Sequence, residues 1–132
     1  MGNPTTFTSL AVDNLIVLTA SKTLTNADSG ANIVRNISTG ITITLPAATV
    51  AGSMFNISVN KVASAGGGDL SIAPPTGSSI VGFNNTVTAG STLALRDTAD
   101  TTGDFITLQS NGSGTWYVVA YNTATAGAWQ EV

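Results

Sequence analysis

The chain has 132 residues, which suits a single domain, and only 8% of them are charged, with a net charge of −3. Hydrophobic residues make up 42% of the sequence, so the composition is not that of a disordered chain. The four basic residues are scattered and the pI is near 4.3, which argues against a nucleic-acid partner. His and Cys are absent, which removes the commonest general base, disulfides and thiolate zinc sites.

The first 14 residues are polar, with isolated apolar side chains at Phe7, Leu10 and Val12. This spacing fits neither a helix nor a regular strand, so we expect an N-terminal arm whose apolar side chains find partners outside their own domain. The alternative is an arm that folds back on its own domain. Because this segment opens without positive charge or an apolar run, we expect no signal peptide.

Short runs that favour β-strands then follow at intervals of roughly ten residues. The clearest are residues 41–45 and 55–60, where apolar side chains alternate with Thr, Asn or Ser, as in half-buried strands. The expected strands cover residues 15–19, 33–37, 41–45, 55–60, 70–72, 80–83, 92–96, 105–108 and 116–121.

No long segment shows a helical period, and Asn111-Gly112 favours a hairpin between the last two expected strands. The pattern predicts an all-β protein, either an antiparallel β-sandwich or a barrel-like fold. We expect a β domain over residues 15–121 and a C-terminal tail over 122–132, which is small and polar until Trp129 and is predicted to be a second arm.

The last expected strand has apolar residues at both alternating sets of positions. Strand alternation places Trp116, Val118 and Ala120 on one face, and Tyr117, Val119 and Tyr121 on the other. We expect Trp116 to be a buried anchor. One small sheet cannot easily bury both faces, so we expect the second set to pack in the core or against another subunit.

Three carboxylates, Asp97, Asp100 and Asp104, lie in one Gly-containing segment. They could bind calcium, but the spacing is not that of an EF-hand and no Glu closes the loop. The alternative is a solvated turn, in which Asp bonds to its own backbone. A glycosidase pair would need an aromatic-lined cleft, and aromatic residues are few. We therefore expect no enzymatic activity, no metal and no cofactor.

The order of turns and strands resembles a small β module of tailed-bacteriophage structural proteins, over roughly residues 18–121. The segments that carry the resemblance are LTASKTLTNADSG at 18–30, ITLP at 43–46, DFITL at 104–108, NG at 111–112 and TWYV at 115–118. At this length the chain is similar to capsid decoration (cement) proteins. The resemblance implies a β-tulip or jelly-roll-like body with extended terminal arms, and no catalytic residues.

The resemblance implies a homotrimer that binds the major capsid protein on the outside of a phage head. In this interpretation Phe7, Leu10 and Val12 contact the capsid, and Trp116, Tyr117, Val119 and Tyr121 form core or trimer contacts. The alternative is a tail-fibre, spike or receptor-binding module that recognises a cell-surface glycan, and a glycan-acting enzyme is a third interpretation. No nucleic acid or membrane partner is expected.

Overall fold

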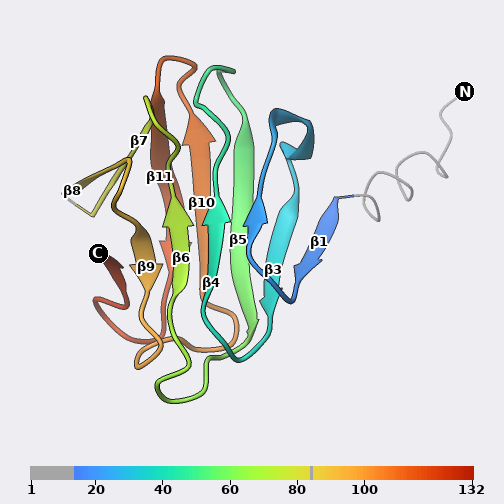
Figure 1. Cartoon of the computed structure of the whole chain (residues 1–132), viewed down its shortest axis with the longest axis vertical. Helices are drawn as coiled ribbons and strands as arrows, with labels where there is room; N and C mark the ends of the chain where they lie inside the picture. The colour runs from blue at the N-terminus through green and yellow to red at the C-terminus, as the bar shows by residue number, and fades with distance from the viewer. Residues whose placement is uncertain (1–13, 84) are drawn as a thin grey trace, which may run out of the picture.

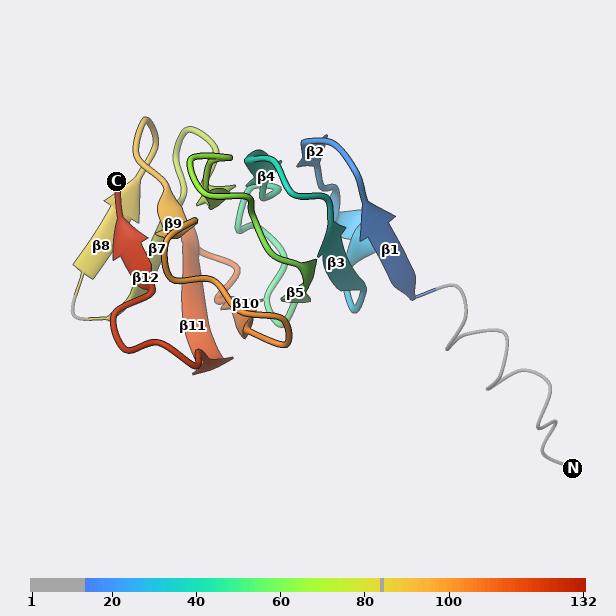
Figure 2. The same cartoon turned by 90° about the horizontal axis from the view of Figure 1, so that it is seen from below.

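The computed structural model describes residues 14–83 and 85–132. Strands take up 47% of the residues and helix 3%, which confirms the all-β class. The strands form two facing sheets, so the protein is a β-sandwich (Figure 1). Figure 2 shows that β1 and β2 lie at one end of the sandwich, and β8 and β12 at the other.

The larger sheet has seven strands and the smaller has five. In spatial order the larger sheet contains β1 (Leu15–Leu18), β3 (Asn32–Asn36), β5 (Met54–Lys61), β10 (Phe105–Ser110), β11 (Thr115–Asn122), β7 (Ser79–Gly82) and β8 (Asn85–Thr88). The smaller sheet contains β12 (Trp129–Glu131), β9 (Leu93–Leu95), β6 (Leu70–Ala73), β4 (Ile41–Thr44) and β2 (Lys22–Thr23). A short 3-10 helix, η1 (Asn26–Asp28), connects β2 to β3.

Consecutive strands from β1 to β6 alternate between the two sheets. Each time the chain re-enters a sheet, the new strand runs in the same direction as the previous strand of that sheet. In the larger sheet β1, β3 and β5 are therefore parallel, and in the smaller sheet β2, β4 and β6 are parallel. The β-sandwich is as expected, but both sheets are mixed and not antiparallel throughout, and β7 and β11 also pair in parallel. Antiparallel pairing joins β10 to β5 and β11, and β9 to β6 and β12.

The core lies between the sheets and follows from the alternation in the sequence. In β4, Ile41 and Ile43 are buried while Thr42 and Thr44 face outward, and β5 and β10 repeat this pattern. The largest fully buried apolar side chains are Trp116, Phe55, Leu24, Ile33, Ile43, Leu45, Ile57, Leu70, Ile72, Ile80 and Leu95.

All nine expected strands are present, and the structure adds β2, β8 and β12. The prediction of a C-terminal arm was wrong. The last residues fold back onto the smaller sheet, where β12 pairs with β9 and Trp129 is only 5% exposed. Burial of Ala128 and Trp129, together with backbone pairing to β9, holds this otherwise small and polar segment. The predicted N-terminal arm and its residues Phe7, Leu10 and Val12 lie outside the described residues.

The strict alternation expected for β11 is also interrupted. Leu108 of β10 lies opposite Val118, but Thr107 lies opposite Ala120, so β11 contains one extra residue, a β-bulge. Beyond the bulge the faces are exchanged. Tyr121 lies opposite the buried Ile106 and therefore shares a face with Trp116, not with Tyr117 as expected.

Candidate interaction surfaces

The outward face of the seven-stranded sheet carries almost no charge. Within these seven strands only two residues are charged: Arg35, which is fully buried on the inward face, and Lys61, the last residue of β5. An average protein surface is rich in charged groups, since about a quarter of all residues are charged. This face is therefore unusually easy to desolvate.

Amide and apolar side chains share this outward face. Across β3, β5 and β10 a hydrogen-bonded row runs over the sheet: Asn56 Nδ2 donates to Asn32 Oδ1 at 3.0 Å, and the Thr107 hydroxyl donates to Asn56 Oδ1 at 3.0 Å. Large apolar side chains exposed beside this row include Leu15, Val17, Met54, Tyr117 and Val119. The amides bond mainly to one another, which lowers the cost of covering them with a partner.

The edge strand β1 extends this face. Among the described residues β1 pairs only with β3, and no described strand covers its other edge. Its sequence, Leu-Ile-Val-Leu, has no charge or proline of the kind that usually protects sheet edges from association. Both the edge and the adjoining face therefore suit contact with another protein surface.

The four residues predicted for core or trimer contact separate into two groups. Trp116 is fully buried, where its indole Nε1–H donates to the Pro46 carbonyl oxygen at 3.0 Å and its ring lies 5.4 Å from that of Phe55. Tyr117, Val119 and Tyr121 are about half exposed, at 45%, 50% and 54%. These three are available for contact with a partner, although Tyr121 also packs edge-on against Phe83.

The three aspartates considered for calcium have separate structural partners. Each accepts hydrogen bonds from backbone N–H groups. The donors are Gly68 for Asp97, Ala63 for Asp100, and Thr101 and Ala124 for Asp104. Asp100 is also paired with the guanidinium of Arg35. Within residues 14–83 and 85–132 no cluster of three metal-ligating side chains is found.

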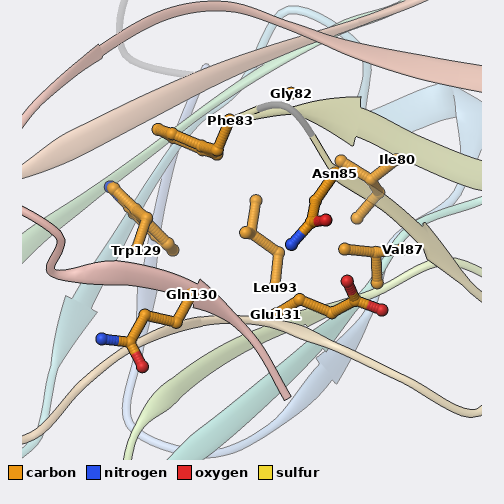
Figure 3. A pocket seen from close by; sticks show the side chains of 9 residues that line it. All are labelled: Ile80, Gly82, Phe83, Asn85, Val87, Leu93, Trp129, Gln130 and Glu131. Atoms are coloured by element: carbon orange, nitrogen blue, oxygen red, sulfur yellow. The ribbon is translucent and has the colours of Figure 1, made fainter.

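A cleft opens at the end of the sandwich where β7 and β8 of one sheet face β9 and β12 of the other (Figure 3). Its volume is about 250 Å³. The apolar floor consists of Ile80, Val87 and Leu93, all buried. The remaining lining residues are Gly82, Phe83, Asn85, Trp129, Gln130 and Glu131.

Phe83 reaches this cleft from a hairpin turn. Gly82 pairs with Asn85 across the β7–β8 hairpin, and the turn of such a tight hairpin normally has Gly, Asn or Asp at its first position, here Phe83, because φ is positive there. Phe83 has φ +53°, the only positive value at a non-glycine among the described residues. A left-handed backbone costs such a residue about 1 to 2 kcal/mol.

The sequence did not identify this cleft as a site. Trp129, which lines the cleft, was assigned to an arm. The one available signal was an aromatic residue at a hairpin position that favours Gly or Asn.

Comparison with known proteins adds no relative. No protein-family model matches this chain, and a search of curated proteins finds no match.

In the part of the chain that the structure describes, none of the helical segments has the length and hydrophobicity needed to cross a membrane.

Proposed function

We propose that this protein is a structural subunit of a bacteriophage particle: a trimeric decoration protein that binds the major capsid protein on the outside of the head and stabilises it. The observation that carries the proposal is the uncharged outward face of the seven-stranded sheet, with exposed Leu15, Val17 and Tyr117. An apolar and amide-rich face of this kind favours burial against a protein surface.

Two further features support a structural role. The interleaved strands and the continuous core give a rigid body, as a coat subunit requires. Three copies joined in a trimer would also bind neighbouring capsid subunits together, so that weak single contacts sum through high effective concentration.

The proposal is tested with phage heads that lack the protein. Val17→Lys places a charge on the outward face at a position that is 52% exposed, so the fold should tolerate it. We expect this variant, and a chain without residues 2–12, to bind heads at least about tenfold more weakly. Ser71→Lys is the matched control, because Ser71 faces outward on the opposite sheet, between the buried Leu70 and Ile72.

Normal decoration of heads by both the Val17→Lys variant and the truncated chain would contradict the proposal. If Ser71→Lys weakened binding to heads as much as Val17→Lys does, any added charge would disturb binding. The capsid contact could then not be assigned to the outward face of the seven-stranded sheet.

A second function is favoured by the cleft between β8 and β12. A tail-fibre, spike or receptor-binding module that recognises a cell-surface glycan would need such a site, with Phe83 and Trp129 as aromatic groups and Asn85 and Glu131 as polar ones.

A further inference from the structure

We infer that the cleft at the end of the sandwich, between Phe83, Asn85, Trp129 and Glu131, is a binding site for one neutral saccharide ring. The inference depends on the cleft alone. It rests on the second function proposed above, glycan recognition at this cleft, and deepens it by naming one neutral ring as the ligand. It would hold for a decoration protein as well as for a fibre module.

The size of the cleft fits a single ring. An enclosed apolar cavity of about 150 Å³ holds a benzene molecule. A cleft of about 250 Å³ has room for a six-membered ring with its hydroxyl substituents, but not for an extended oligosaccharide. Further sugar units would have to leave through the open side of the cleft.

The chemistry of the lining requires a ligand that is apolar on some faces and polar at its edge. The half-buried ring of Phe83 suits a C–H face of a sugar, while Ile80, Val87 and Leu93 are almost fully buried and form the packed wall behind it. Figure 3 shows the Asn85 amide reaching toward the middle of the cleft above Leu93, and the Glu131 carboxylate lying near Val87 at its edge. A purely apolar ligand would desolvate these two groups without replacing their hydrogen bonds.

Trp129 forms one wall of the cleft. Figure 3 shows its indole nitrogen on the side of the ring away from Asn85 and Leu93, and this Nε1–H is buried with no hydrogen-bond partner among the described residues. By contrast, the indole of Trp116 donates to the Pro46 carbonyl oxygen in the core. The two indole N–H groups therefore report on different places, one beside the cleft and one in the core.

The charge of the lining excludes acidic ligands. No Lys or Arg lines the cleft, and Glu131 would repel a carboxylate or phosphate. Phe83 also holds an unfavourable backbone conformation at the edge of the cleft. Strained residues concentrate at ligand-binding positions, where the surrounding structure maintains them.

The test is a titration of the ¹⁵N-labelled full chain with glucose, galactose and N-acetylglucosamine, each to about 100 mM, which covers millimolar Kd values. The readout is the pair of indole N–H signals, assigned with a Trp129→Phe variant. At least one sugar should move the Trp129 signal to saturation. The Trp116 signal, from the closed core, should stay in place.

Asn85→Ala and Glu131→Gln should each raise the Kd by about fivefold to tenfold, as expected for the loss of one hydrogen bond. Thr86→Ala is the matched control, because Thr86 lies on the same exposed strand and faces away from the cleft. Its Kd should equal that of the parent chain.

Three results would overturn the inference. They are no movement of the Trp129 signal with any of the three sugars, an unchanged Kd in both cleft variants, or saturation by choline without any sugar response, which would indicate an amine site. The titration uses the isolated chain and the decoration assay uses phage heads, so failure of one is distinguishable from failure of the other.

Discussion

The guanidinium of Arg35 is paired with the carboxylate of Asp100 inside the sandwich, although 65 residues separate them in the chain. The side chains are 0% and 2% exposed. Arg35 Nε also donates to the Lys61 carbonyl oxygen, at 3.1 Å, and Ala63 N–H donates to Asp100 at 2.9 Å. The pair thus connects β3, the end of β5 and the segment before β10.

Removing one partner of this pair should be costly. Asp100→Ala leaves the charge of Arg35 buried and unpaired, and should lower the free energy of unfolding by about 3 to 5 kcal/mol in urea denaturation. Replacing both groups, as Arg35→Met with Asp100→Ala, should recover much of this loss. The control is Arg96→Met, which breaks the more exposed pair with Asp69 and should cost about 1 kcal/mol or less. If Asp100→Ala were as stable as Arg96→Met, the Arg35–Asp100 pair would not be important for stability.

Trp116 should be an anchor of the core. Trp116→Ala removes a fully buried ring and its bond to Pro46, and should cost about 3 to 5 kcal/mol of unfolding free energy. Tyr117→Ala, on the adjacent exposed position, should change stability by only about 0.5 kcal/mol. If Trp116→Ala kept its stability but lost glycan binding, the ring would be a ligand platform and not a core residue.

Gly82 should be required by its close approach to β11. A Cβ at this position would lie 2.6 Å from Cγ2 of Val118, so Gly82→Ala should destabilise the chain by about 1 to 3 kcal/mol. Thermal unfolding of Gly82→Ala, Val118→Ala and the double variant checks this. The double variant should lose less unfolding free energy than the two single variants lose together, by more than about 0.5 kcal/mol. Strict additivity would argue against the contact.

The oligomeric state should be a homotrimer. Sedimentation equilibrium of the intact chain should give about 40 kDa, three times the 13.2 kDa of one copy. If the outward face of the larger sheet forms the contact, Tyr117→Arg should shift the mass toward the monomer, and Ser71→Lys should not. A monomer at micromolar concentration would contradict the trimer.

The fold class could be predicted because, in most strands, apolar and polar residues alternate in the sequence as buried and exposed positions alternate in the structure. Residues 41–45 alternate Ile and Leu with Thr, and the structure buries the apolar set. Sheet membership could not be predicted in the same way. Each strand shows which positions are buried but not which neighbour it pairs with, and that depends on crossing connections between sheets.

The missed features depend on single long-range contacts. β12 is held by pairing with β9 and by burial of Trp129, and no local pattern in residues 122–132 predicts this. The bulge in β11 likewise follows from its pairing with β10. The cleft combines residues from β7, β8, β9 and β12, which only the folded chain brings together.

Electron microscopy of phage particles prepared with and without this protein tests the central proposal most directly. We predict sandwich-shaped density in groups of three on the outer surface of the head, with the seven-stranded sheet facing its protein neighbours. The density should be missing from particles made without the protein and should return when the purified chain is added. Density confined to the tail or its fibres, with bare heads in the same particles, would contradict a decoration protein.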